Sequence, residues 1–185
     1  LSCLLAALVI GIYFFLQLGS AVLPLALAGG LIAVFFTPLM MRGLKEPVVF
    51  LTFGPLCMLG VDFVLTGQFR MEPILASLPV GFLVTLVAYL KGAHYRFKED
   101  SNSTIILNLK PTTAAWLLAL AYLSLAVGVL AGFLKSPTLL GLLTMPFAYP
   151  LVRKLKTYKT IPDYLWATVS ALVIFICTGI LMALG

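Results

Sequence analysis

The sequence predicts an all-α polytopic membrane protein with about seven transmembrane helices. Two observations support this fold class. The 185 residues are 62% hydrophobic and only 10% charged, a composition that excludes a soluble domain of this length. Ten of the twelve Lys and Arg residues lie in alternate connections between apolar stretches, an asymmetry typical of multi-spanning membrane proteins. We expect a single transmembrane helical domain over residues 1–185.

Each predicted helix corresponds to one apolar stretch. A hydrocarbon core about 30 Å thick needs about 20 apolar residues per helix, and most stretches reach that length. The sixth is short and contains Pro146 and Pro150, so we expect it to be kinked or tilted. Pro24, Pro55 and Pro79 lie within other stretches, where they should kink the helix and free carbonyl groups towards a cavity or a neighbouring helix. In chain order, the stretches are Leu1–Leu18, Ala21–Met41, Pro47–Gly67, Pro73–Leu90, Thr113–Leu134, Thr138–Val152 and Pro162–Leu184.

The distribution of cations also predicts an orientation. Cytoplasmic loops of membrane proteins are rich in Lys and Arg, and here the even-numbered connections hold ten of these residues. The odd-numbered connections hold only Arg70 and Lys135. We therefore expect loops 42–46, 91–112 and 153–161 to be cytoplasmic and the C-terminus to lie on the opposite side.

The net charge of +6 favours a negatively charged binding partner. No aromatic–basic motif of a DNA- or RNA-binding module is present, so nucleic acid is excluded as a partner. Cations at the predicted cytoplasmic edge instead favour anionic membrane lipid or an anionic substrate.

The connection Lys91–Thr112, 22 residues long, is the main candidate for a polar site. Its cations, together with Arg42, would form a basic rim suited to a diphosphate, although cations that only set the topology would give the same pattern. The candidate diphosphate-binding residues are Arg42, Lys91, Arg96 and Lys98.

Three further residues of this connection carry chemistry. Glu99 and Asp100 are adjacent carboxylates near these cations, as a Mg²⁺-bridged diphosphate requires; the alternative is a solvated pair. His94, the only histidine, is a candidate base or ligand, with simple solvation as the alternative.

Asp62 is an ionisable residue within the third apolar stretch, between Val61 and Phe63. A carboxylate at membrane depth is costly and is a functional candidate by default. Its distance of five residues from Gly67 leaves open a hydrated position near the interface.

Part of the chain resembles the UbiA-type membrane prenyltransferases. The resemblance is carried by Phe35-Phe-Thr-Pro38, Arg42-Gly-Leu-Lys-Glu46, Phe53-Gly-Pro-Leu-Cys-Met-Leu-Gly60, Thr66-Gly67 and Leu78-Pro-Val-Gly81. It implies a helical bundle in which this chain corresponds to the third to ninth of nine helices. The connection at 91–112 then corresponds to the second Asp-rich loop of the family, and Arg42 to a basic position near the diphosphate.

Two functions follow from this resemblance. The first is transfer of a polyprenyl chain from its diphosphate to an aromatic acceptor, such as a quinone precursor or a tetrapyrrole, with Mg²⁺ as cofactor. However, an ungapped register puts Ala93 and Phe97 where the family has aspartates, while a short deletion lets Asp100 stand for the second. The second function is therefore a non-catalytic accessory subunit of a larger membrane complex, which binds lipid, quinone or pigment. A transporter that depends on Asp62 is a third, weaker alternative.

Overall fold

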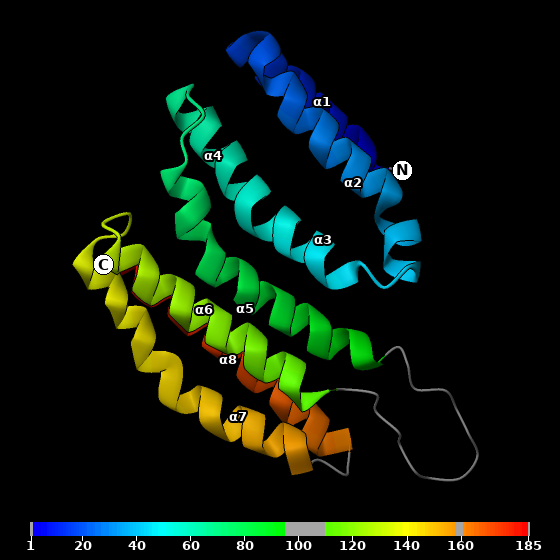
Figure 1. Cartoon of the computed structure of the whole chain (residues 1–185). Helices are drawn as coiled ribbons and strands as arrows, with labels where there is room; N and C mark the ends of the chain where they lie inside the picture. The colour runs from blue at the N-terminus through cyan, green and yellow to red at the C-terminus, as the bar shows by residue number, and fades with distance from the viewer. Residues whose placement is uncertain (1, 95–109, 158–160, 185) are drawn as a thin grey trace. The chain divides into compact units, whose positions relative to one another are not determined.

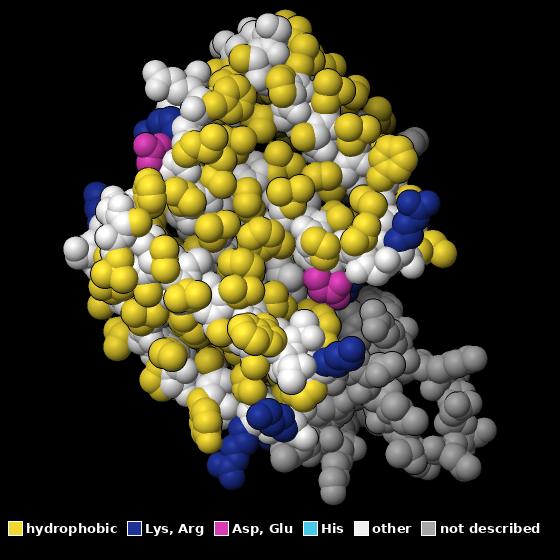
Figure 2. Space-filling model, viewed as in Figure 1, with side chains coloured by type: hydrophobic (Ala, Val, Ile, Leu, Met, Phe, Trp, Pro, Cys, Tyr) yellow, Lys and Arg dark blue, Asp and Glu magenta, His cyan; other side chains and the backbone are white. Residues whose placement is uncertain are grey.

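A computed structural model describes residues 2–94, 110–157 and 161–184. All regular secondary structure in these ranges is helical, which confirms the all-α class (Figure 1). Large hydrophobic side chains remain exposed along most of the helices, and Figure 2 shows a face on which they predominate. Such surfaces are compatible with an integral membrane protein, because lipid rather than water would cover them.

Five helical stretches in the described ranges are long and apolar enough to cross a membrane. The first is 37 residues long, but the chain reverses within it, at Gly19, so that it contains two helices. The seven predicted stretches all fall on helical elements, and the number of membrane crossings stays a prediction. The five stretches are Leu5–Met41, Lys45–Thr66, Glu72–Lys91, Pro111–Leu130 and Leu165–Leu184.

Contacts between helices divide the chain into two compact units, Leu1–Ile74 and Leu75–Gly185. The first, unit 1, begins with a hairpin of two helices. Gly19 adopts a φ of 72°, which a residue with a Cβ rarely reaches, and the short 3₁₀ helix η1 completes the reversal. The elements of unit 1 are α1 (Ser2–Leu18), η1 (Gly19–Val22), α2 (Leu23–Met41), α3 (Lys45–Leu51), η2 (Thr52–Leu56) and α4 (Cys57–Thr66).

The three prolines predicted to kink helices behave differently. Pro24 lies in the first turn of α2, where its missing N–H leaves no intrahelical hydrogen bond unmade. Pro55 lies in η2, a π-helical turn in which the N–H of Cys57 donates to the carbonyl oxygen of Thr52, five residues back. Pro79 lies inside α5 (Glu72–His94), which continues past it as an α-helix. The predicted disruption is therefore seen as a change of helix type at Pro55.

The second unit, unit 2, is a packed bundle. Leucines of α5 and α7 (Met145–Thr157) meet small residues of α6 (Pro111–Leu130) and α8 (Ile161–Leu184) in one core. Small side chains let helix backbones approach closely in a membrane, which explains the buried alanines, four of them on α6 and α8 and the fifth, Ala148, on α7. The core residues are Leu83, Leu86, Leu90, Ala114, Leu118, Ala121, Tyr122, Ala148, Leu151, Leu155, Ala167, Ala171 and Ile174.

A buried chain of three hydroxyl groups links three helical elements of unit 2. The Tyr122 hydroxyl on α6 is 3.0 Å from Thr144 Oγ1, which in turn is 2.7 Å from Thr178 Oγ1 on α8. Thr144 ends η3 (Ser136–Thr144), a 3₁₀ helix. These contacts satisfy polar groups that lipid could not, and so they tie three elements together.

The sixth apolar stretch, predicted as a kinked helix over Thr138–Val152, spans two elements. The 3₁₀ helix η3 changes to the α-helix α7 at Met145. Pro146 therefore occupies the first turn of α7, and Pro150 lies inside it.

The long connection also begins later than its predicted boundary at Lys91. Helix α5 continues to His94, because Gly92 lowers helix propensity by only about 1 kcal/mol and no proline or cap ends the helix earlier. Helix α6 begins at Pro111.

Candidate functional site

The candidate diphosphate-binding cations that the structure describes are Arg42 and Lys91. Arg42 is exposed directly after α2, where its backbone N–H caps the helix by donating to Pro38 and Leu39. Lys91 is exposed near the end of α5. The two residues belong to different units, so each is described in its own unit.

The remaining loop candidates are largely outside the described residues. Arg96, Lys98, Glu99 and Asp100 all lie in 95–109, and the predictions made for them stand as predictions. His94 is the last residue of α5. Within the described ranges, no three His, Cys, Asp or Glu side chains gather in a group that could hold a metal ion.

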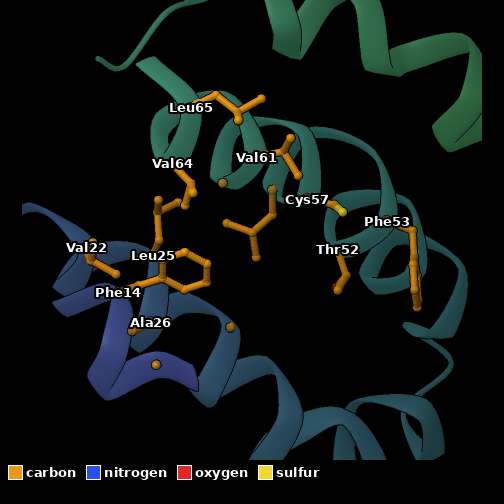
Figure 3. Close-up of a pocket in the computed structure, with 14 residues that line it drawn as sticks. Phe14, Val22, Leu25, Ala26, Thr52, Phe53, Cys57, Val61, Val64 and Leu65 are labelled. Carbon is orange, nitrogen blue, oxygen red and sulfur yellow. The ribbon is translucent and has the colours of Figure 1, made fainter. Parts of the chain in front are cut away.

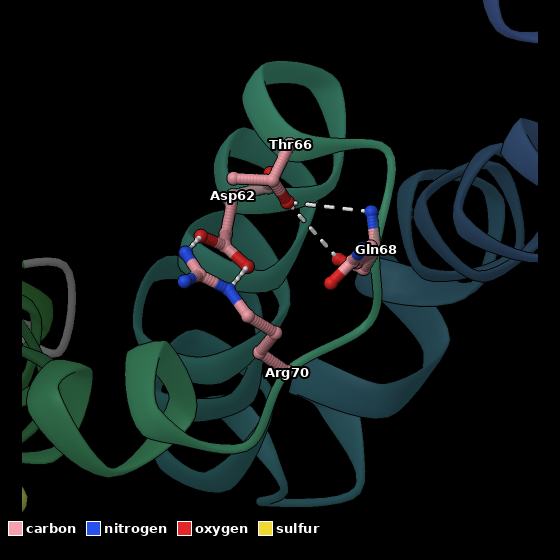
Figure 4. Close-up of polar contacts among 4 residues, drawn as sticks. All are labelled: Asp62, Thr66, Gln68 and Arg70. Carbon is pink, nitrogen blue, oxygen red and sulfur yellow. Dashed lines mark hydrogen bonds and ion pairs between the residues drawn. The ribbon is translucent and has the colours of Figure 1, made fainter.

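Asp62 has a partner that the sequence reasoning missed. Arg70, in the turn between α4 and α5, forms a two-pronged ion pair with the Asp62 carboxylate (Figure 4). Its Nε donates to Oδ2 at 3.0 Å, and its Nη2 donates to Oδ1. Asp62 is only 9% exposed, whereas the Arg70 side chain is 47% exposed. The guanidinium therefore extends from the exposed turn towards the buried carboxylate. The hydrogen bonds with Asp62 raise the pKa of Arg70.

Further contacts attach the same turn to α4. Gly67 ends the helix with a φ of 69°, and the N–H of Gln68 donates to Thr66 Oγ1 at 3.3 Å. The Phe69 ring stacks on Phe63, with 4.4 Å between ring centroids. The ion pair is therefore one of several contacts that hold this turn against α4; we call the segment Gly67–Arg70 the fastened turn. The spacing of eight residues between Asp62 and Arg70, with a helix-ending glycine between them, was the available sequence signal.

Unit 1 also contains a cavity of about 600 Å³, which we call the unit 1 cavity (Figure 3). This volume falls within the range of small-molecule sites. Side chains of the α1–α2 hairpin, such as Phe14 and Leu25, face Val61 and Val64 of α4 across the space. The lining residues are Gly11, Phe14, Val22, Leu25, Ala26, Gly29, Thr52, Phe53, Leu56, Cys57, Gly60, Val61, Val64 and Leu65.

The lining of the unit 1 cavity is almost entirely hydrocarbon. Thr52 carries its only hydroxyl group, which donates to the carbonyl oxygen of Val48 at 2.7 Å within the same helix. The π-helical turn η2 supplies Thr52, Phe53 and Leu56, so the first residue of the Phe53-Gly-Pro stretch forms part of the wall. Turns of this type are frequent at functional sites.

Three glycines widen this cavity. A Cβ added at Gly11, Gly29 or Gly60 would meet no heavy atom within 4 Å. In membrane proteins glycine usually allows two helices to approach closely. Here the space beside each glycine is open instead.

Comparison of the chain with protein-family models, curated proteins and solved structures gave no match. The site therefore has to be interpreted from its chemistry. In unit 1, the apolar cavity is lined by Leu25, Ala26 and Gly29 from the first two turns of α2, whereas the exposed cation Arg42 follows the last turn of that helix.

Proposed function

We propose that this chain is a UbiA-type membrane prenyltransferase homologue that binds a polyprenyl diphosphate at its cationic connections. The observation that carries the proposal is Arg42, an exposed cation within the stretch of family resemblance and between two apolar helices. A guanidinium pairs strongly with phosphate oxygens, and its place beside apolar helices suits a head group whose chain stays in the membrane. Lys91, Arg96 and Lys98 are the further cations proposed for the diphosphate.

The proposed reaction is transfer of the prenyl chain to an aromatic acceptor. The bond between C1 of the chain and the diphosphate oxygen breaks, and its electron pair leaves with the diphosphate. The allylic cation then forms a carbon–carbon bond to the acceptor ring, which loses a proton to solvent. Glu99 and Asp100 would hold Mg²⁺, because two carboxylates together with substrate oxygens suit this ion. The metal would stabilise the charge of the departing diphosphate.

One observation favours a second function, binding without transfer. In the ungapped register, Ala93 and Phe97 occupy positions where the family has aspartates. Departure of the diphosphate would then lack much of its electrostatic support. The same chain would serve as an accessory membrane subunit that holds an isoprenoid, a quinone or a pigment.

The test compares two ligands that share the same prenyl group but carry different head groups, a diphosphate and an alcohol. The full chain in lipid nanodiscs should bind geranylgeranyl diphosphate more tightly than geranylgeraniol. Arg42→Gln should weaken diphosphate binding by roughly tenfold, since a hydrogen bond to a charged group contributes about 1.5–3 kcal/mol. Lys135→Gln is the matched control, because Lys135 is an exposed cation in a connection of the opposite predicted side.

Prenyl transfer is then measured with a radiolabelled diphosphate, Mg²⁺ and a set of aromatic acceptors. Transfer that is lost in Asp100→Asn supports the enzyme. Arg42-dependent binding without transfer to any acceptor supports the accessory subunit. Equal affinity for alcohol and diphosphate, unchanged by Arg42→Gln, would overturn both forms of the proposal.

A further inference from the structure

Helix α7 turns one side towards the core of unit 2 and leaves another side exposed. Ala148, Leu151 and Leu155 are buried, at a spacing that places them together on a helix. A second set of residues, separated by four, four and three positions, shares a different side, because residues three or four apart are neighbours on a helix surface. All four are exposed, and we call them the α7 stripe: Met145, Tyr149, Arg153 and Lys156.

The chemistry of the α7 stripe changes in order along the helix. It begins at the apolar Met145, which is 58% exposed, continues at the phenol of Tyr149, which is 72% exposed, and ends at two cations. Lys156 follows Met145 by eleven residues, a rise of about 16 Å. A phospholipid has the same order of groups, namely acyl chain, ester-linked glycerol backbone and phosphate. Tyrosine is enriched at the level of the head groups, and cations beside it attract anionic lipid.

A contact on the neighbouring flank of α7 fixes the orientation of the stripe. Lys154 lies over the Trp166 ring of α8, with 4.3 Å between its Nζ and the ring centroid. Leu155 of α7 and Ala171 of α8 also belong to the same core. The stripe is therefore carried by a helix that is held in place from behind, so a ligand would not have to order it.

The charge around the α7 stripe favours an anionic head group. The sequence from Ser136 to Gly185 contains four cations, all between residues 153 and 159, and one acidic residue, Asp163. A zwitterionic head group would bring a cation of its own to this surface, whereas an anionic head group brings only negative charge. A soluble phosphate would use the cations but would leave Met145 and Tyr149 without a role.

We propose that the α7 stripe binds an anionic phospholipid. Its phosphate lies at Arg153 and Lys156, where a guanidinium pairs strongly with phosphate oxygens, and its glycerol backbone and acyl chain lie along Tyr149 and Met145. This inference goes beyond the proposed function and does not depend on it, because none of these four residues is proposed for the diphosphate.

The first test compares two phospholipids with the same acyl chains. Native mass spectrometry of the full chain, released from detergent, measures how much phosphatidylglycerol or phosphatidylcholine stays bound. Phosphatidylglycerol should bind more tightly. Arg153→Gln and Lys156→Gln should each weaken its binding by about fivefold, the contribution of one cation beside an anionic lipid, and should leave phosphatidylcholine unchanged. Equal binding of the two lipids to the unmodified protein would overturn the inference.

Lys154→Gln is the matched control. It removes the same charge from the same helical turn, but Lys154 lies over Trp166 and is not part of the stripe. Binding of phosphatidylglycerol should change by less than about twofold in this variant, and also in Lys135→Gln, which alters an exposed cation at the start of η3. Equal weakening by Lys154→Gln and Lys156→Gln would overturn the stripe, because the effect would then follow only the overall charge of the helix end.

A substitution at Tyr149 tests the apolar part of the stripe. Tyr149→Ser should weaken binding of both phospholipids to a similar extent, because the ring contacts the part of the molecule that they share. No effect on either lipid would contradict the proposed placement. Displacement of phosphatidylglycerol by glycerol 3-phosphate at equal concentration would assign the cations to a soluble anion instead.

The last measurement uses the unmodified protein, so it does not depend on the folding of any variant. Phosphatidylglycerol with a diazirine near its glycerol backbone is photolysed on the full chain in nanodiscs, and the labelled peptides are identified by mass spectrometry. Label on α7 that unlabelled phosphatidylglycerol displaces better than phosphatidylcholine supports the inference. Label spread evenly over the exposed helices would overturn it.

Discussion

The two units of this chain differ in what their helices enclose. Unit 2 encloses a continuous core of leucine, alanine and hydroxyl-bearing side chains, several of them completely inaccessible. The helices of unit 1 instead line an open cavity of about 600 Å³, larger than a pocket of about 250 Å³ in unit 2, and few of the described residues of unit 1 are buried. Those residues are Val49, Gly54, Asp62 and Phe63.

This difference separates a scaffold from a ligand-binding region. Close packing opposes the entry of a ligand, because the packed side chains would have to move apart and give up their mutual dispersion attraction. The open cavity, the π-helical turn and the glycines that line the cavity all occur in unit 1. Substitutions of residues between the helices should therefore affect stability in unit 2 and binding in unit 1.

The largest expected effect is a truncation in the core of unit 2. Leu86 is fully buried, so Leu86→Ala should lower the free energy of unfolding by about 2–5 kcal/mol. Leu31→Ala on α2 should change it by less than about 0.5 kcal/mol, because Leu31 is 57% exposed. Unfolding in mixed micelles, followed by circular dichroism, measures both. Similar losses of stability in the two variants would contradict the comparison.

The next effect comes from adding a side chain at a glycine. A Cβ at Gly141 would lie 3.0 Å from Leu125 Cδ2 and 3.2 Å from Met182 Cγ. Gly141→Leu should therefore overpack unit 2 and destabilise it by about 1–3 kcal/mol. Gly29→Leu in unit 1 should leave thermal unfolding unchanged. A tolerant Gly141 would show that unit 2 can expand, and the contrast between the units would be lost.

A smaller effect is expected from the hydroxyl chain. Thr144→Val removes the central group and leaves Tyr122 and Thr178 without their partner. Hydrogen bonds between membrane helices contribute about 0.6 kcal/mol on average and about 1.7 kcal/mol at most, so the loss should be about 1–3 kcal/mol. Thr85→Val is the control, since the hydroxyl of buried Thr85 donates to the Gly81 carbonyl oxygen of its own helix. In a double-mutant cycle, the stability losses of Thr144→Val and Tyr122→Phe should be coupled. If the two losses were additive, the hydroxyl groups of these residues would not act as one connected network.

The helical class could be predicted because it depends on composition and on the length of the apolar stretches. A 62% hydrophobic chain must satisfy its backbone hydrogen bonds internally, and apolar stretches of near-membrane length do so as helices. Helix type was less predictable. Proline disfavours a regular helix, but whether it produces a π-helical turn, as at Pro55, or occupies a first turn, as at Pro24, depends on where the helix begins.

The candidate site was predicted only in part. Arg42 was identified from its charge and its motif, since both are visible along the chain. The unit 1 cavity was not, because its wall combines residues as far apart as Gly11 and Leu65 that come together only through the hairpin and α4. The partner of Asp62 was missed for a related reason. A carboxylate within an apolar stretch indicates that a partner is needed, but it does not say which nearby cation folds back to it.

The smallest effect on stability is expected at the ion pair of Asp62 and Arg70, and it should differ between the two partners. Arg70 is almost half exposed, and exposed pairs contribute little, so the pair should matter mainly through the carboxylate it neutralises. Arg70→Gln leaves a buried charge without its cation and should lower the melting temperature. Asp62→Asn leaves only an exposed guanidinium and should lower it less. The double variant should then melt closer to Asp62→Asn than to Arg70→Gln, because the uncompensated carboxylate is gone. If the two single variants melt alike, the pair acts as an ordinary surface contact, and the fastened turn depends on Gly67 and the stacked Phe63 and Phe69 rings instead.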